Sequence, residues 1–199
     1  MKLLYSPTSP YARKVRVCLI EKGLAGQVDI VGVDVLGKPH MVRGDNPLAK
    51  IPTLVLDDGT SLFDSPVICE YLDGLAPAPK LIPDGAARFE VLKRQALADG
   101  AMDAAFNLVM ERRRPEPQRS EEWTTRWTNA ISHALAALDA QISANAPFDL
   151  GWIAALCARD YVEFRLGDLG LAARTPKLTA WRATLADRPS IAISNPPAG

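Results

Sequence analysis

The first 75 residues carry a fixed order of strand and helix signals, and this order constrains the fold more than any other feature of the sequence. Residues 2–5 (KLLY) and 28–35 (VDIVGVDV) are short and mainly apolar, as is typical of buried strands. Between them, residues 11–22 place apolar side chains at helical spacing and end before Gly23. These signals predict a strand, a helix and a second strand.

A hairpin and a second helix follow. Residues 53–63 (TLVLDDGTSLF) place two apolar runs around an Asp-Asp-Gly turn, which predicts two antiparallel strands. Asp64 and Ser65 can then cap a helix that has Pro66 as its first residue and runs to about residue 75. The order is therefore βαβ followed by ββα.

A right-handed βαβ crossover makes the first two strands parallel, and the hairpin adds an antiparallel pair. We therefore expect an α+β domain over residues 1–77, with a four-stranded mixed sheet in the thioredoxin-like arrangement. Residues 78–84 belong to a stretch that is rich in proline, which favours a linker. Residues 85–199 are predicted to form an all-α domain. Its helices are expected at about 86–113, 120–143, 149–164 and 176–187.

The charge balance and hydropathy limit the possible partners. Lys plus Arg and Asp plus Glu both number 23, so the formal net charge is zero. Such a chain has no general field that attracts nucleic acid or an acidic membrane, and we expect a small partner instead. No segment approaches about 18 uninterrupted apolar residues, and the first residues do not form a signal-peptide pattern. We therefore expect a cytoplasmic protein.

The cysteines and histidines do not form a metal-binding pattern. Cys18, Cys69 and Cys157 contain no CxxC pair, and His40 and His133 are distant from them in sequence. Buried, reduced thiols are the simplest interpretation, since free cysteine behaves as a small hydrophobic residue. We expect no bound metal.

The turn before the first helix is the candidate centre of chemistry. A thioredoxin-like domain exposes this helix N-terminus beside the end of the first strand, where unpaired N–H groups and the helix dipole favour an anion. In redox proteins of this fold the anion is a cysteine thiolate. Here residues 8–11 are TSPY and include no cysteine. The turn is therefore predicted to stabilise the thiolate of a bound ligand through a serine or tyrosine hydroxyl.

Three segments stand in an order and spacing that match one family. They are residues 6–16 (SPTSPYARKVR), residues 46–54 (NPLAKIPTL) and residues 63–72 (FDSPVICEYL). Together with the proline-rich linker and the helical second domain, they resemble the cytosolic glutathione S-transferases, in particular bacterial, serine-type branches. The first segment resembles the catalytic turn, the second resembles the approach to a cis-proline, and the third resembles the site for the glutamyl end of glutathione.

The resemblance implies an enzyme that binds glutathione as co-substrate and presents its thiolate to a small hydrophobic electrophile. It implies that Ser9 donates to the sulfur, although Ser9 is also a favourable helix N-cap. Thr8 is an alternative donor. Tyr11 is a second catalytic candidate and could also line the acceptor pocket. Tyr5 is the rival, because tyrosine-type transferases have a catalytic tyrosine at the end of the first strand; packing at the sheet is its simpler role.

The resemblance also implies how the rest of glutathione is held. The bond between Ile51 and Pro52 would be cis, although only about 5–6% of X–Pro bonds are. Ile51 would then pair its backbone with the cysteinyl backbone like an added strand. Lys50 and Lys38 would meet the glycyl carboxylate, with solvated surface as the alternative for each.

The segment FDSPVICEYL would hold the glutamyl end of glutathione. The N–H and hydroxyl of Ser65 suit the γ-glutamyl carboxylate, and Asp64 suits the ammonium group. The alternative is that both residues only cap the helix.

The second domain offers candidates for the acceptor pocket. Met102, Phe106 and Met110 fall on one helical stripe, for which core packing is the alternative. Residues 112–114 (RRR) are a basic cluster, either a solvated loop or a guide for an anionic substrate. The family's Ser/Thr-x-x-Asp capping box is replaced here by residues 149–152 (DLGW), which can cap the helix but cannot form the reciprocal bond.

The resemblance implies a homodimer, with Arg88, Arg94 and Gln95 as candidates for its interface. It implies a role in detoxification, with the electrophile left open. Two other functions fit the same residues: a glutathione-dependent disulfide reductase or peroxidase, and a non-catalytic binding or adaptor protein.

Overall fold

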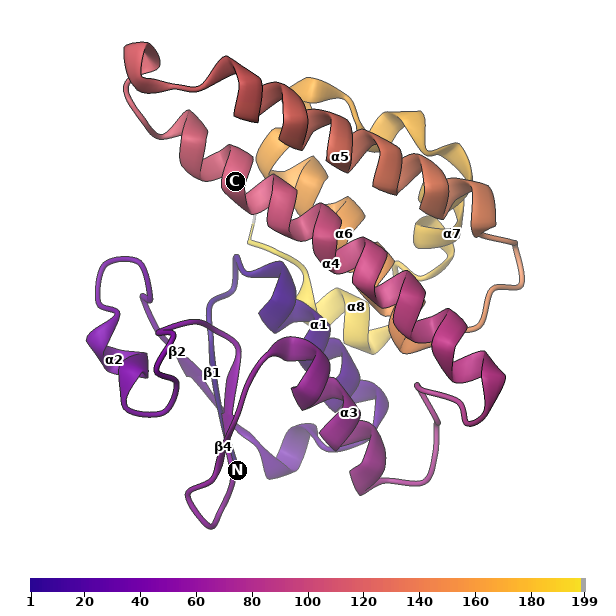
Figure 1. Cartoon of the computed structure of the whole chain (residues 1–199). Helices are drawn as coiled ribbons and strands as arrows, with labels where there is room; N and C mark the ends of the chain where they lie inside the picture. Colours follow the sequence, from indigo (N-terminus) through magenta and orange to yellow (C-terminus); the bar gives the residue numbers. More distant parts are fainter. Residues whose placement is uncertain (198–199) are drawn as a thin grey trace. The chain divides into compact units, whose positions relative to one another are not determined.

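The expected βαβ and ββα order is present in the computed structural model, which describes residues 1–197 (Figure 1). The elements of the first 75 residues are β1 (Lys2–Tyr5), α1 (Pro10–Glu21), β2 (Asp29–Gly32), α2 (His40–Arg43), β3 (Thr53–Val55), β4 (Ser61–Leu62) and α3 (Ser65–Leu75). The second strand is shorter than expected, and the short helix α2 was not predicted.

The strands form one mixed sheet in the order β2-β1-β3-β4. β1 and β2 are parallel, as the crossover rule requires, while β1–β3 and β3–β4 are antiparallel. α1 and α3 pack against each other on one side of the sheet (Figure 1). The predicted thioredoxin-like α+β domain is confirmed.

Local sequence explains where α1 begins and ends. Ser9 is its N-cap, and the Ser9 Oγ accepts a hydrogen bond from the Ala12 N–H at 3.2 Å. Pro10 is the first helical residue, where its missing N–H has no consequence. The helix is followed by Gly23 at φ +68°, a left-handed conformation that favours glycine.

The helical part contains the four expected helices, which confirms an all-α arrangement. They are α4 (Ala86–Arg112), α5 (Glu121–Gln141), α6 (Leu150–Leu166) and α7 (Pro176–Thr184). α4 packs along both α5 and α6, and most residues of α6 are buried. Asp149 caps α6, because its carboxylate accepts the Trp152 N–H at 2.9 Å.

The chain divides into two compact units, residues 1–82 with 187–197 and residues 83–186. Residues 187–197, which we expected within the helical domain, therefore group with the sheet unit. They contain α8 (Pro189–Ser194), which packs on α1. The last two residues of the expected helical domain, 198 and 199, lie outside the described residues.

The segment after α3 is fixed to the first unit. Lys22 Nζ donates to Asp73 Oδ1 at 2.9 Å and to the carbonyl oxygens of Ala76 and Pro79 at 2.6 and 2.7 Å. Asp73 also accepts the N–H groups of residues 81 and 82. The first part of the expected linker is therefore held by a buried ion pair.

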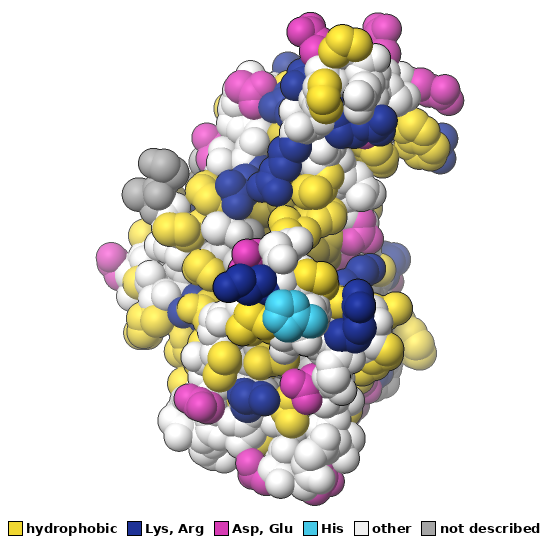
Figure 2. All heavy atoms as spheres, turned by 90° about the vertical axis from the view of Figure 1, so that its left-hand side faces the viewer, with side chains coloured by type: hydrophobic (Ala, Val, Ile, Leu, Met, Phe, Trp, Pro, Cys, Tyr) yellow, Lys and Arg dark blue, Asp and Glu magenta, His cyan; other side chains and the backbone are white. Residues whose placement is uncertain are grey.

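The surface shown in Figure 2 carries acidic and basic side chains interspersed with hydrophobic ones, in line with the zero net charge. Among residues 1–197, no helix is long and apolar enough to span a membrane. Cys18, Cys69 and Cys157 are buried, and no disulfide joins them within the described residues.

Candidate functional site

The sheet register brings three predicted segments to one edge of the first unit. Leu4 near the end of β1 pairs with Thr53 at the start of β3, so the turn after β1 lies beside the chain before β3. Leu54 pairs with Leu62, so the residues that follow β4 reach the same edge. The N-termini of α1 and α3 and the Ile51–Pro52 segment therefore converge there.

Ser9 is the hydroxyl at the start of α1. It is half-buried, its Oγ accepts the Ala12 N–H, and its own N–H donates to the Ser6 carbonyl oxygen at 3.1 Å. An oxygen that accepts from the helix keeps its hydroxyl proton as a donor. Capping and donation to a ligand are therefore compatible. Thr8 Oγ1 lies 3.2 Å from Ser6 Oγ, so the Thr8 hydroxyl takes part in the turn itself.

The two candidate tyrosines occupy different environments. Tyr5 ends β1, and the guanidinium carbon of Arg16 lies 5.1 Å from the centre of its ring, a cation–π contact. Tyr11 is the second residue of α1 and is half-buried. The packing role that we expected for Tyr5 has a visible partner in Arg16.

The segment before β3 has the expected cis bond between Ile51 and Pro52. Within residues 1–197, the backbone of Ile51 takes part in no hydrogen bond, so its N–H and C=O are available to a ligand. The side chains of Lys50 and Lys38 are exposed. Lys38 lies on the chain that follows β2, at the same edge of the sheet.

Asn46 holds this loop together, a role that was not predicted from the sequence. Its side chain is 1% exposed, and its Nδ2 donates to the Lys50 carbonyl oxygen at 3.0 Å and to Thr53 Oγ1 at 3.2 Å. Thr53 Oγ1 in turn donates to the same carbonyl at 2.9 Å. Asn46 Oδ1 also accepts the Leu48 N–H at 3.0 Å, and a buried amide with three partners is a strong positional constraint. The only signal in the sequence was the Asn-Pro pair at residues 46–47, which is typical of a turn.

The start of α3 contains an unsatisfied polar atom. Asp64 is the N-cap, and its carboxylate accepts the Ser65 N–H. Ser65 is fully buried, and within the described residues its Oγ has no hydrogen-bond partner. A buried hydroxyl without a partner is unfavourable by about 1–3 kcal/mol, so it calls for an explanation. Ser65 also differs from our expectation, because its N–H is already engaged by Asp64.

The acceptor candidates of the second unit all lie on α4. Met102 is fully buried, Phe106 is 36% exposed and Met110 is half-buried. The stripe thus passes from core to surface toward the C-terminal end of the helix. Phe106 and Met110 are the members that a ligand could reach.

Of the residues that we considered for a dimer interface, Arg94 is engaged within the chain and Gln95 is buried. Arg94 Nη1 donates to both carboxylate oxygens of Asp149 at 3.2 Å, and its guanidinium carbon lies 4.2 Å from the centre of the Trp152 ring. Gln95 is only 2% exposed. Arg94 therefore supports the start of α6 rather than a free surface.

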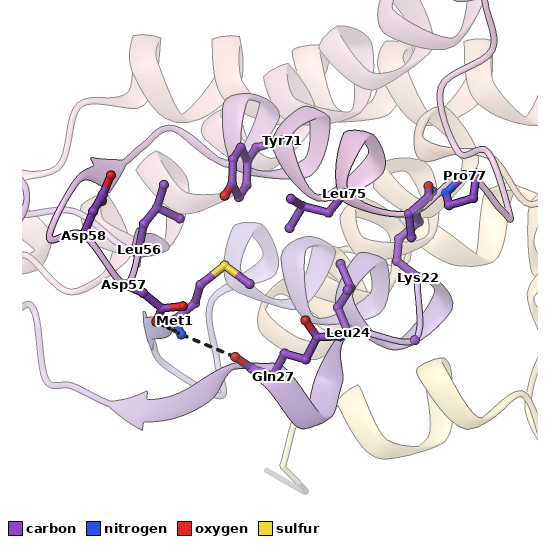
Figure 3. A pocket seen from close by; sticks show the side chains of 12 residues that line it. Met1, Lys22, Leu24, Gln27, Leu56, Asp57, Asp58, Tyr71, Leu75 and Pro77 are labelled. Carbon is purple, nitrogen blue, oxygen red and sulfur yellow. Dashed lines mark hydrogen bonds and ion pairs between the residues drawn. The ribbon is translucent and has the colours of Figure 1, made fainter.

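A pocket of about 650 Å³ also occurs in the first unit, at the opposite edge of the sheet (Figure 3). It is lined by the start of β1, the β3–β4 turn and the C-terminal ends of α1 and α3, including Leu24, Leu56, Tyr71 and Leu75. Ser9 follows the other end of β1. This pocket is therefore separate from the site described above.

Among residues 1–197, no group of three or more His, Cys, Asp and Glu side chains is placed to hold a metal ion. The fold and the site define a thioredoxin-fold protein with a helical second unit and a hydroxyl, in place of a thiol, at its first helix.

Comparisons with known proteins agree with this class. Residues 3–80 match the family model of the glutathione S-transferase N-terminal domain. The chain is 35% identical to the uncharacterized GST-like protein YibF of Escherichia coli, over 99% of both chains. It therefore belongs to the glutathione S-transferase family.

Solved structures extend the comparison to the fold. A glutathione transferase family member from Pseudomonas fluorescens, solved with bound glutathione, is 38% identical, with a TM-score of 0.94 over 99% of both chains. A glutathione S-transferase from Methylobacillus flagellatus, also with glutathione bound, is 42% identical, with a TM-score of 0.91 over 98% of both chains.

Proposed function

We propose that the protein is a glutathione transferase. It binds glutathione along the sheet edge formed by the N-termini of α1 and α3 and the Ile51–Pro52 segment, and it presents the thiolate to a small hydrophobic electrophile. The observation that carries this proposal is the buried hydroxyl of Ser65, which has no partner within the described residues and stands at that edge. The γ-glutamyl carboxylate of glutathione would satisfy it.

The three segments fit the three parts of glutathione. The Ser65 hydroxyl would donate to the γ-glutamyl carboxylate, and Asp64 would accept from the ammonium group. The backbone of Ile51, which has no partner within residues 1–197, would pair with the cysteinyl residue. The exposed cations Lys50 and Lys38 would meet the glycyl carboxylate.

Ser9 would then act on the sulfur. Its hydroxyl proton would donate to the thiolate while its oxygen continues to cap α1, and the positive end of the α1 dipole would favour the charge. A hydrogen bond to a charged group contributes about 1.5–3 kcal/mol, and about 1.4 kcal/mol corresponds to one pKa unit. Ser9 alone would thus lower the pKa of the bound thiol by about one to two units.

A lowered thiol pKa raises the fraction of nucleophile at neutral pH. The sulfur would form a bond to the electrophilic carbon, and the displaced pair of electrons would leave with the leaving group or move into the acceptor. Tyr11 would assist the sulfur or line the acceptor pocket. Phe106 and Met110, with Met102 behind them, would supply its apolar wall. Binding both reactants raises their effective concentration.

Two solved structures of relatives support glutathione as the ligand. The Pseudomonas fluorescens and Methylobacillus flagellatus proteins carry bound glutathione in their structures. We further propose that the protein is a cytoplasmic homodimer with a role in detoxification, on the basis of its family.

The test is a calorimetric titration of glutathione into the wild type, Ser9→Ala and Tyr5→Phe, followed by rate measurements with a haloarene, a peroxide and a small disulfide. We expect binding by all three proteins and haloarene conjugation that falls in Ser9→Ala but not in Tyr5→Phe. Turnover of the peroxide or disulfide alone would assign the reductase function. Glutathione binding without turnover would assign a binding protein, and absence of glutathione binding would contradict the proposal.

A further inference from the structure

The last described helix returns to α1 and lies along it. α8 packs on α1 within the first unit (Figure 1). At the C-terminal end of α1, Arg188 Nε donates to the Glu21 carboxylate at 2.8 Å. In the first turn of α1, Arg13 Nη2 donates to Asn195 Oδ1 at 3.0 Å. Residues 188–195 are therefore tied to both ends of α1.

Arg13 connects this segment to the turn that carries Ser9. The Arg13 backbone N–H donates to the Ser9 carbonyl oxygen at 3.0 Å, the first hydrogen bond of the helix. Its side chain donates from Nε to Ser194 Oγ at 3.4 Å and from Nη2 to Asn195 Oδ1. Arg13 is 3% exposed and Ser194 is fully buried. Because a guanidinium is planar and its donors have a fixed geometry, two acceptors fix its orientation.

Arg16 connects the same segment to the other side of the turn. Its Nη2 donates to the Ile193 carbonyl oxygen at 3.1 Å, and its guanidinium carbon lies 5.1 Å from the centre of the Tyr5 ring. Tyr5 is the last residue of β1, and Ser9 is the N-cap of α1. The turn between β1 and α1 therefore has both of its ends connected to residues 193–195.

We propose that residues 193–195 hold the turn between β1 and α1 and thereby position the Ser9 hydroxyl. Ser194 and Asn195 are positioning residues in this account, because they act on Ser9 through Arg13. The inference rests on the proposed function, in which Ser9 donates to the glutathione sulfur. A hydrogen bond weakens when its distance or angle departs from the optimum, so a loosened first turn of α1 would weaken this donation.

The first arm of the test measures the turn in the protein without glutathione. The double variant Ser194→Ala with Asn195→Ala removes both side-chain acceptors of Arg13 described above. We expect the amide hydrogens of residues 12 and 13, which bond to Ser9, to exchange about threefold to tenfold faster.

Ser190→Ala is the matched control. It removes a side-chain hydrogen bond between the same segment and α1, but at the opposite end of the helix, where Ser190 Oγ donates to Glu21. It should change the exchange of residues 12 and 13 less than twofold. Unchanged exchange in the double variant, or an equal increase in Ser190→Ala, would overturn the proposal that residues 193–195 hold the turn.

The second arm measures the thiol pKa of bound glutathione and kcat for conjugation. We expect the double variant to raise this pKa by about half a unit, a fraction of the one to two units assigned to Ser9. At a pH below the thiol pKa, kcat should therefore fall about threefold. The deficit should disappear at a pH where the thiol is ionised in both proteins, which a loss of folded protein would not do.

The outcomes of the two arms separate the inference from the proposed function. Faster exchange with an unchanged thiol pKa would overturn the positioning role toward the sulfur. A wild-type thiol pKa equal to that of free glutathione would contradict the proposed function instead. The exchange rates would then decide by themselves whether residues 193–195 hold the turn.

Discussion

The ion pair between Glu21 and Arg188 joins the end of α1 to the start of α8, and its removal should destabilise the first unit. Arg188 Nε donates to Glu21 Oε1 at 2.8 Å, and its Nη2 donates to Oε2. Ser190 Oγ donates to the same carboxylate at 2.5 Å. The side chain of Glu21 is 10% exposed, whereas that of Arg188 is 37% exposed. The perturbation that we choose is Arg188→Ala.

The expected loss in the free energy of unfolding follows from this partial burial. Breaking a buried ion pair costs about 3–5 kcal/mol, whereas an exposed pair contributes about 0–1 kcal/mol. Because the Arg188 end is partly solvated, we expect Arg188→Ala to lower the free energy of unfolding by about 2 kcal/mol. The matched control is Lys93→Ala, which removes a pair with Glu90 whose side chains are 65% and 63% exposed. It should cost at most about 0.5 kcal/mol.

The loss of stability caused by Arg188→Ala should depend on pH in a defined direction. Burial acts to raise the pKa of the Glu21 carboxyl, but the hydrogen bonds from Arg188 and Ser190 and the charge of Arg188 hold this pKa below its ordinary value of 4.5. The folded state therefore binds fewer protons than the unfolded chain. The stabilisation is fully present above the ordinary pKa and is lost as the pH falls through the folded-state pKa. The difference between wild type and Arg188→Ala should shrink in acid.

The assay is urea denaturation followed by far-UV circular dichroism at neutral and acid pH. The four tryptophans lie between residues 123 and 181, in the second unit, so tryptophan fluorescence reports that unit separately. We expect Arg188→Ala to shift the transition of the first unit, with an unchanged m-value. Equal losses in Arg188→Ala and Lys93→Ala, or a loss that does not change with pH, would refute this reasoning.

Two further substitutions test the first unit. Lys22→Met removes a fully buried ammonium group that pairs with Asp73 and donates to the carbonyls of Ala76 and Pro79. Denaturation should show that the free energy of unfolding falls by about 3–5 kcal/mol. A fall below about 1 kcal/mol would contradict a structural role for the pair. Ser65→Ala removes a buried hydroxyl without a partner in residues 1–197, so the free energy of unfolding without ligand should rise, by up to about 1–3 kcal/mol. Calorimetry should show about tenfold weaker glutathione binding. A stability loss with unchanged affinity would show that Ser65 has only a structural role.

The fold of the first unit could be predicted because local sequence signals mark where its helices begin. Ser9 before Pro10 and Asp64 before Ser65 each mark a helix start, and the structure places both as N-caps. α8 was not predicted, because six residues are too few for a periodic pattern. It forms through tertiary contacts, such as the bond from Arg13 Nη2 to Asn195 Oδ1 at 3.0 Å, which no local pattern encodes.

The residue types of the candidate site were proposed from the sequence, whereas the contacts of these residues required the structure. A buried, unsatisfied Ser65 hydroxyl depends on packing around α3, and the Asp64 contact to the Ser65 N–H depends on the cap geometry. Asn46 could not be distinguished from a simple turn residue, because its bonds to Lys50 and Thr53 require the folded loop. Residue identity thus suggested the chemistry, while burial and partners needed the structure.

The most direct test of the central claim is the pKa of the thiol of protein-bound glutathione, followed through the ultraviolet absorbance of the thiolate as the pH is raised. The wild type should bind glutathione with a thiol pKa below that of free glutathione. Ser9→Ala should raise this pKa by about one to two units, while Ser9→Thr and Tyr5→Phe leave it nearly unchanged. An unchanged thiol pKa in Ser9→Ala, together with a raised thiol pKa in Tyr5→Phe, would contradict the proposed role of Ser9. It would show that Tyr5 stabilises the thiolate.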